Sequence, residues 1–241
     1  REMKSVQYKR ECVFVEKLLY ATDSDGSIYT LAGFYKDIVK LLSKNMDVVE
    51  LQDFRTPMPE PDWTAVKKIK LRDYQVEASL DLIFKGQEDS GVVNATGGFG
   101  KTHIQAITYA AWNKLNTILT IPLKQVVLQT YEKFKIFFPD KHIGIVGDGK
   151  NDVSNDITIT TFRSLQNCAL EKCQMLLVDE MQSASQDSFQ NCLKQMKPYR
   201  MFGFSATTEG LFNNSDKLLK GLFGEDLIYF PYEEAEEAGA V

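Results

Sequence analysis

The chain has 241 residues, which is long enough for one large domain or for two unequal ones. Its apolar fraction of 44% and its charged fraction of 25% are ordinary for a globular protein. The net charge of −5 gives no overall basic signal for nucleic acid, although a local basic groove would be enough to bind it.

Further classes of protein are excluded by the cysteines and the hydropathy, and the first residue bears on processing. The four cysteines form no CxxC pair and have no histidine at metal-binding spacing, so structural zinc is not expected. Reduced thiols in a cytoplasmic protein are the simplest interpretation. No apolar run is long enough to span a membrane, and no signal peptide is visible. Because the chain begins at Arg1 and not at a methionine, we expect a processed or partial product.

Residues 1–55 predict a small α/β accessory domain. The expected elements are, in order, strands at 12–15 and 27–31, a helix at 34–42 and a strand at 47–51. The sequence Asp-Ser-Asp-Gly between the first two strands is a turn signal. Basic side chains in this domain suit duplex DNA, but acidic ones are almost as numerous. A solvated mixed surface is therefore the better interpretation, and DNA binding by this domain is the alternative.

Residues 56–69 are expected to form a linker, since three prolines within five residues block both helix and ladder pairing. From residue 70 to residue 230, strands alternate with amphipathic helical stretches. The strands are expected at 92–95, 117–122, 142–146, 156–160, 174–179 and 200–205. Some of them are almost continuously apolar, which is typical of strands buried on both faces. The pattern predicts an α/β fold with a mainly parallel, doubly wound sheet and with ligands at the carboxyl ends of its strands.

Residues 95–102 carry the strongest motif, Ala-Thr-Gly-Gly-Phe-Gly-Lys-Thr, between an apolar run and a helical segment over 103–115. The motif fits the phosphate-loop pattern G-x-x-x-x-G-K-[ST], except that Ala95 stands at the first glycine. In such a loop, backbone N–H groups and a lysine face the phosphates, and the threonine hydroxyl binds Mg²⁺. The residues of this loop that we expect to bind ATP are Thr96, Gly97, Gly98, Phe99, Gly100, Lys101 and Thr102.

Asp179 and Glu180 directly follow an apolar strand. A carboxylate at that point can hold Mg²⁺, and its neighbour can orient or deprotonate the attacking water. We therefore expect Asp179 to bind the metal together with Thr102, and Glu180 to activate water. The hydroxyl residues Ser205 and Thr207 end another apolar strand, where hydrogen bonds to this acidic cluster would relay the nucleotide state.

Arg72 and Gln75 lie just after the proline-rich segment. A glutamine amide offers a donor and an acceptor, so Gln75 can recognise the edge of adenine, and Arg72 can stack on the base. The alternative interpretation of the same residues is the start of a surface helix.

Taken in order, four motifs resemble the first RecA-like lobe of a superfamily 2 helicase. They are Leu-Arg-x-Tyr-Gln at 71–75, the phosphate loop at 95–102, Asp-Glu-x-Gln at 179–182 and Ser-Ala-Thr at 205–207. Residues 121–125 resemble motif Ia and residues 160–165 resemble motif Ib, which contact the sugar–phosphate backbone in that family. The resemblance implies that nucleic acid contacts Lys124, Gln125, Thr161 and Arg163. Residues preceding this lobe make the chain similar to phage recombination and branch-migration helicases.

Two departures from the family pattern bear on function. Gln182 stands where the family has His or Asp, and it joins Lys101, Asp179 and Glu180 as an expected catalytic residue that cannot titrate near neutral pH. No motif of the second helicase lobe follows Thr207, and residues 231–241 resemble the start of the connection to that lobe. The resemblance therefore implies a truncated helicase, inactive or weakly active without its second lobe.

The function implied by the resemblance is an ATP- and Mg²⁺-dependent DNA helicase or translocase. It would couple ATP hydrolysis to unwinding or branch migration in recombination, repair or replication, on branched or single-stranded DNA in preference to RNA. A cytoplasmic location is expected, in the host cytoplasm if a phage encodes the chain. Two alternatives stay open: a translocase on double-stranded DNA that does not unwind it, and a nucleotide-dependent binding module without turnover.

Overall fold

The computed structural model describes residues 2–5, 12–15, 20–22, 24, 27–45, 53, 55–206 and 215–239. The strand expected at 47–51 and the residue Thr207 lie outside these ranges. No helix in the described ranges has the length and hydropathy needed to cross a membrane.

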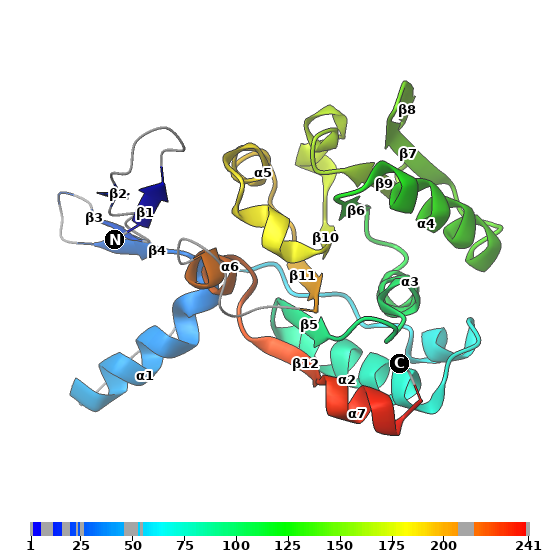
Figure 1. Ribbon diagram of the computed structural model, residues 1–241, viewed down its shortest axis with the longest axis horizontal. Helices are drawn as coiled ribbons and strands as arrows, with labels where there is room; N and C mark the ends of the chain where they lie inside the picture. The colour runs from blue at the N-terminus through cyan, green and yellow to red at the C-terminus, as the bar shows by residue number, and fades with distance from the viewer. Residues whose placement is uncertain are drawn as a thin grey trace.

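The lobe is built on an eight-stranded sheet with the order β12-β5-β11-β10-β6-β9-β7-β8 (Figure 1). All neighbouring strands are parallel except β7 and β8, which are antiparallel. The strands are β5 (Gly91–Ala95), β6 (Thr117–Ile121), β7 (Ile143–Gly147), β8 (Lys150–Asp152), β9 (Ile157–Thr161), β10 (Met175–Asp179), β11 (Arg200–Ser205) and β12 (Asp226–Phe230). The predicted α/β fold with a mainly parallel sheet is confirmed.

Helices cover both faces of the sheet. On one face lie the helices η2 (Trp63–Lys67), α2 (Asp73–Glu88), α3 (Lys101–Ala111) and α4 (Lys124–Phe137), and on the other lie η5 (Met181–Ser185), α5 (Asp187–Leu193) and α6 (Ser215–Phe223). Alternate residues of β10 enter the two apolar cores: Leu177 packs with the first set and Val178 with the second, both fully buried. Each such side chain contributes about 1.5–3 kcal/mol of hydrophobic stabilisation, which explains the continuous apolar strands.

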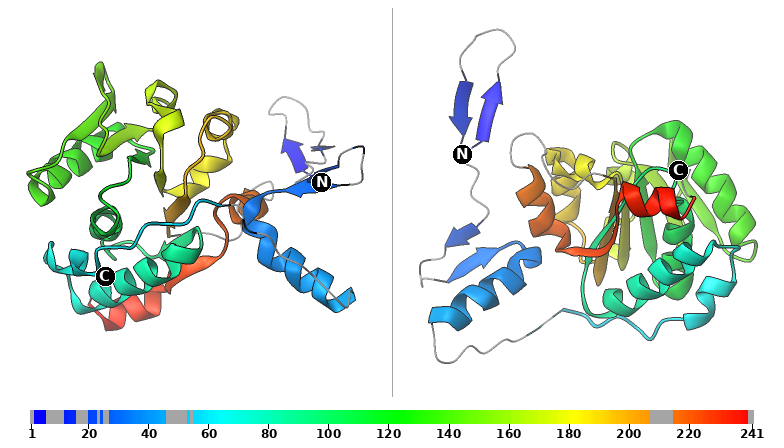
Figure 2. Two further views of the ribbon diagram at one scale, coloured as in Figure 1. Left: turned by 180° about the vertical axis from the view of Figure 1, so that it is seen from behind. Right: turned by 60° about the horizontal axis from the view of Figure 1, so that its bottom comes forward.

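Of residues 56–69, expected to be a linker, 56–62 run along the lobe as an extended cyan segment in Figure 2, and Trp63–Lys67 form η2. Met58, Ala65 and Ile69 are buried in the first core. The indole Nε1 of Trp112 donates a hydrogen bond to the carbonyl of Pro59 over 3.1 Å. The prolines keep residues 56–62 out of helix and sheet, as expected, but apolar side chains of 56–69 still pack on the helices of the lobe.

The described residues of the expected N-terminal domain form two separate antiparallel pairs of strands and one α-helix. Its elements are β1 (Glu2–Ser5), β2 (Cys12–Val15), β3 (Tyr20–Thr22), β4 (Ile28–Thr30), η1 (Ala32–Phe34) and α1 (Tyr35–Asn45). Figure 1 shows α1 projecting away from the lobe. Asp89, at the end of α2, joins the two parts: it accepts a hydrogen bond from the Tyr35 hydroxyl at 2.9 Å and pairs with Lys36 and Arg55.

The last described elements complete the lobe. β12 pairs in parallel with β5, with Tyr229 opposite Asn94, and forms one edge of the sheet. α7 (Tyr232–Glu237) follows it directly. The sequence pattern did not predict this strand, although residues up to 230 were expected to belong to the lobe. Because β12 is the direct neighbour of the strand that carries the phosphate loop, this addition matters for the site.

Candidate active site and nucleic-acid interface

The phosphate loop leaves the carboxyl end of β5 and enters α3 through left-handed glycines. Gly98 and Gly100 have φ angles of 82° and 88°, a conformation that strongly favours glycine. A Cβ on Gly97 would meet no atom within 4 Å, so the loop is open on that side. The ammonium of Lys101 donates a hydrogen bond to the carbonyl of Ala95 over 3.0 Å. The residues present therefore fit a phosphate chain, with backbone N–H groups of α3 and one lysine at hand.

The phosphate loop packs against the rest of the lobe through a cluster of three aromatic rings. The ring of Phe99 is fully buried, 4.7 Å from the ring of Phe230 and 5.4 Å from that of Tyr74. The N–H of Thr96 donates a hydrogen bond to the carbonyl of Phe230. Phe99, expected among the ATP-binding residues, can thus offer a nucleotide only its backbone. The edge strand β12 supports the loop directly, a contribution that the sequence pattern did not indicate.

The two residues expected at the base are both bonded within the chain. Arg72 donates from its guanidinium to the Tyr74 hydroxyl at 3.0 Å and to the Gly239 carbonyl at 3.3 Å, and lies over the Tyr74 ring. Gln75 is only 5% exposed, and both ends of its amide make hydrogen bonds to the backbone. Both residues lie at the start of α2, next to the phosphate loop, and the side-chain amide of Gln75 points toward the backbone of that loop.

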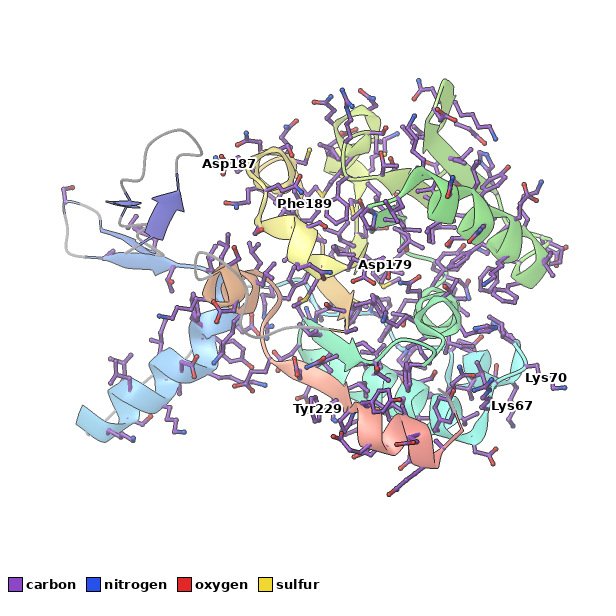
Figure 3. The ribbon with its side chains drawn as sticks, in the orientation of Figure 1. Lys67, Lys70, Asp179, Asp187, Phe189 and Tyr229 are labelled. Atoms are coloured by element: carbon purple, nitrogen blue, oxygen red, sulfur yellow. The ribbon has the colours of Figure 1, made fainter. Side chains whose placement is uncertain are left out.

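The acidic pair lies two strands from the phosphate loop, at the same edge of the sheet. Asp179 ends β10 and lies at the centre of the lobe, far from the surface lysines Lys67 and Lys70 (Figure 3). Burial, with a further contribution from the charge of Glu180, raises the pKa of Asp179 to about 6. Glu180 has a φ of 48°, which is uncommon for a residue with a Cβ and is typical of functional sites.

A chain of hydrogen bonds links β11 to the acidic pair. The Ser205 hydroxyl donates to Oε1 of Gln182 over 2.9 Å, and Nε2 of Gln182 donates to a carboxylate oxygen of Glu180 over 2.7 Å. Ser205 therefore reaches the acidic cluster through Gln182, while Thr207, expected to bond to the same cluster, lies outside the described residues. Gln182 uses both ends of its amide, a role that a glutamine fills and a carboxylate does not.

Gln105, which no sequence motif singled out, also contacts the acidic pair. Its Nε2 donates a hydrogen bond to Oδ1 of Asp179 over 2.9 Å, from a side chain that is 1% exposed. The available signal was a polar residue, one turn after Lys101, in a helix whose following residues are otherwise mostly apolar.

The donor set fits Mg²⁺ bound together with phosphates. Thr102 is the second residue of α3 and is half-buried, and Asp179 makes no ion pair within the described residues. No group of three or more His, Cys, Asp or Glu side chains in those residues is placed to hold a metal without other ligands. Magnesium is usually held by one or two carboxylates plus substrate phosphates, and this site offers that combination.

Three of the four residues expected to contact nucleic acid are exposed and follow β6 or β9 at the carboxyl edge of the sheet, which we call the rim; the fourth, Thr161, ends β9 and is buried. β6 and β9 are parallel neighbours with Ile121 opposite Thr161, so the segments after these strands come together. Lys124 and Gln125 start α4 and are exposed, as is Arg163 after β9. The Thr161 hydroxyl donates to the Ser164 hydroxyl over 3.1 Å.

The turn between β7 and β8 extends the same rim. Three consecutive residues have positive φ angles: Gly147 at 125°, Asp148 at 55° and Gly149 at 78°. The turn borders a hollow of about 530 Å³ that also includes Lys150 and Ser164. Asp148 pairs with Lys124 at 2.7 Å, which joins the turn to α4. The Gly-Asp-Gly sequence at 147–149 is a turn signal, from which no element was predicted.

Comparison with known proteins gives one family and several similar folds. The family model described as type III restriction enzyme, res subunit, matches residues 68–210. The crystal structure of the UvsW helicase from bacteriophage T4 is similar over 86% of this chain and 83% of that chain, with 20% identity and a TM-score of 0.62. No curated protein sequence matches the chain.

Two further structures are longer than this chain. A second structure of T4 UvsW matches with 21% identity and a TM-score of 0.58, over 85% of this chain and 47% of that chain. The Sulfolobus solfataricus SWI2/SNF2 ATPase core in complex with dsDNA matches with 17% identity and a TM-score of 0.52, over 72% and 37%. At these identities the likeness is one of fold.

Proposed function

The chain belongs to the family of the type III restriction enzyme res subunit and is a superfamily 2 helicase-type lobe, and on this premise we propose that it is the ATP-hydrolysing part of a DNA helicase or translocase. The observation that carries the proposal is the hydrogen-bonded chain from Ser205 through Gln182 to Glu180. This series of hydrogen bonds ends at Glu180, beside Asp179, at the edge of the sheet that also carries the phosphate loop.

Each residue of the site has a distinct task in this proposal. The Lys101 ammonium leaves the Ala95 carbonyl and compensates the charge of the β- and γ-phosphates. Thr102 and Asp179 would hold Mg²⁺, which neutralises phosphate charge when it is bound. Glu180 orients the attacking water and accepts its proton. Gln105 fixes the Asp179 carboxylate by a hydrogen bond to one of its oxygens.

The rim formed by Lys124, Gln125, Thr161 and Arg163 is proposed to hold the sugar–phosphate backbone. Amides, hydroxyls and guanidinium groups bind phosphates without recognising sequence, as a motor that moves along a strand requires. The Ser205–Gln182–Glu180 chain gives the lobe a hydrogen-bonded route between β11 and the residue that orients water. We propose that movement of a bound strand is coupled to hydrolysis along this route, in DNA recombination, repair or replication.

The experiment is ATP hydrolysis by this chain and by the longest natural product that contains it. Turnover is measured without nucleic acid and then with single-stranded, branched and double-stranded DNA and with RNA. Lys101→Ala should lower turnover by about 100-fold or more, because phosphate charge is left uncompensated. Lys114→Ala, at an exposed lysine just after α3, is the matched control. Near-normal turnover by Lys101→Ala would overturn the assignment of the loop.

A second candidate is a motor on double-stranded DNA that does not separate the strands. The family description, a restriction enzyme subunit, favours it. Stimulation by duplex DNA without strand displacement would support this candidate, and strand displacement would support the helicase. If the longest product bound nucleotide without hydrolysing it, this result would support the third candidate, a nucleotide-dependent binding module.

A further inference from the structure

We infer that the outer side of α4, together with β8, binds the sugar–phosphate backbone of a nucleic acid where it leaves the rim, an inference that rests on the proposed nucleic-acid interface. This surface, the α4–β8 face, consists of Lys124, Leu128, Tyr131, Lys135 and Lys150. The ammonium of Lys135 lies 5.2 Å from the centroid of the Tyr131 ring, and that of Lys150 lies 5.8 Å from it. Two cations from separate elements therefore meet at one aromatic ring.

These two ammonium groups are not neutralised by ion pairs. In the part of the chain that the structure describes, neither Lys135 nor Lys150 forms a salt bridge. Asp148 lies near enough to Lys150 for their charges to interact, but its carboxylate is paired with Lys124 at 2.7 Å. Two like charges at one ring repel each other, and an anion bound between them removes this repulsion. The α4–β8 face is thus locally basic on a chain with a net charge of −5.

The helical repeat makes the α4–β8 face continuous with the rim. Lys124, Leu128, Tyr131 and Lys135 follow one another at intervals of three or four positions, the spacing of neighbours on one side of an α-helix. The lysines are exposed and the Tyr131 side chain is half-buried. From Lys124 to Lys135 the helix rises by about 16 Å, so the face extends the rim by roughly this length.

β8 brings Lys150 to the same face from the edge of the sheet. β8 pairs with β7, with Lys150 opposite Gly147, and Figure 1 shows it at the same end of the sheet as α4. The ion pair between Asp148 and Lys124 joins the turn before β8 to the start of α4. The two elements thus meet at the rim and again at Tyr131. This arrangement holds the cations in place before a ligand arrives and lowers the entropic cost of binding.

A nucleic-acid backbone is the partner whose chemistry fits this face. Lysine ammonium groups bind phosphates without recognising sequence. Because the face begins at Lys124, which is also part of the rim, one nucleic acid can contact both surfaces. Single strands and duplexes share the phosphate chemistry, but they differ in the number of counterions that each lysine contact releases. The salt dependence of binding therefore tells them apart.

The test is equilibrium binding of fluorescent oligonucleotides to the 241-residue chain at several salt concentrations. Single-stranded and duplex probes are used in two lengths: about 6 nucleotides, enough for the rim alone, and about 20, enough for both surfaces. With the longer probes, Lys135→Ala and Lys150→Ala should each reduce the slope of log Kobs against log salt by about 0.7 for a single strand or about 0.9 for a duplex. The shorter probes should be unaffected. Lys133→Ala, at an exposed lysine on another side of α4, is the matched control and should change no slope.

Tyr131→Leu tests the aromatic ring separately from the charges. This variant keeps both lysines but removes the ring that positions them, so the longer probes should bind about threefold more weakly with little change of slope. Circular dichroism checks that the variant folds. Unchanged affinity in the folded variant would show that the ring does not position the lysines.

The outcomes separate the inference from the proposed function. Unchanged slopes for the longer probes in a double variant, Lys135→Ala with Lys150→Ala, would overturn the inference. Equal losses with the shorter and the longer probes would also overturn it, because the lysines would then act at the rim. Arg163→Ala, at the rim, should weaken both lengths whatever the lysine variants do. Absence of binding of every probe to the wild-type chain would overturn the proposed nucleic-acid interface itself.

Discussion

Gln105 on α3 donates a hydrogen bond to Asp179 on β10 over 2.9 Å, and this contact ties the helix after the phosphate loop to the acidic end of a strand. Asp179 needs such a partner because burial and the neighbouring charge of Glu180 both disfavour its ionised form and raise its pKa to about 6. In the chain without a bound cation, ionised Asp179 therefore lowers the stability of the fold.

The first prediction concerns pH and stability. The pKa of Asp179 is about 6 in the folded chain, against 3.8 for an ordinary aspartate side chain. The raised pKa means that the stabilisation by protonated Asp179 is complete below about pH 4 and is lost as pH rises through about 6. Between pH 4 and pH 8, in a chelator, the wild type should lose up to about 3 kcal/mol of unfolding free energy relative to Asp179→Asn.

Chemical denaturation at several pH values measures this difference. Asp187→Asn is the matched control, because Asp187 is exposed on α5 and lies well away from Asp179 in Figure 3. Its curve should run parallel to that of the wild type. If Asp179→Asn also ran parallel to the wild type, the carboxylate would not be the buried, unfavourable charge described above.

The second prediction concerns the Ser205–Gln182–Glu180 chain. Ser205→Ala removes one donor and Gln182→Ala removes both bonds of the amide, so each interrupts the same route. DNA-stimulated ATP hydrolysis should fall in each variant, and the double variant should be no worse than the more damaging single one. The coupling energy from the double-mutant cycle should be about 0.5–2 kcal/mol. Ser188→Ala, on the exposed side of α5, is the control, and additive effects would contradict a shared route.

Much of the lobe was predictable because each central strand carries its own signal. A strand buried on both faces is apolar at successive positions, as in β10, and the phosphate loop has a fixed glycine and lysine spacing. β8 and β12 were not predicted for physical reasons. All three residues of β8 are polar and exposed, and β12 becomes a strand by pairing with β5, which lies far back in the chain. A short edge strand carries no local sign of its partner.

The roles of the two buried glutamines show the limit of motif reasoning at the site. Local spacing placed Gln75 near a nucleotide but could not show where its amide points, because Phe99 is 24 positions away. The hydrogen bond of Gln105 was not predictable because its partner Asp179 is 74 positions away in the sequence. In both cases the chemistry depends on hydrogen bonds between elements that meet only in the folded sheet.

The third prediction concerns thiol reactivity. Cys168, Cys173 and Cys192 are free and buried. Burial raises the pKa of the Cys168 thiol to about 11 and that of Cys173 to about 12, so the reactive thiolate is scarce at pH 8. In a Cys12→Ser background, Ellman's reagent should modify the native chain at least about 100-fold more slowly than the chain in urea. Rapid modification of one thiol in the native chain would contradict the burial of that residue.

The fourth prediction concerns the contact between the N-terminal domain and the lobe. Gly33 in η1 lies against the backbone of α6, where a Cβ would overlap the carbonyl oxygens of Lys220 and Gly221. Backbone groups of a packed helix cannot move aside as a flexible side chain can, so Gly33→Ala must separate η1 from α6 or strain both. We expect the unfolding free energy to fall by about 2 kcal/mol or more, and amides of α6 to exchange faster with deuterium.

Gly97→Ala is the matched control for this contact. A Cβ at Gly97 meets no atom within 4 Å, and its φ is not positive, so the same substitution should change the unfolding free energy by less than about 1 kcal/mol. The comparison separates a general effect of replacing glycine from the loss of a close approach. Gly221→Ala should destabilise the same contact less than Gly33→Ala does, since its Cβ would overlap only the side chains of Phe34 and Leu31, which can shift. Equal stability of Gly33→Ala and Gly97→Ala would mean that the N-terminal domain is not held on α6 by this packing.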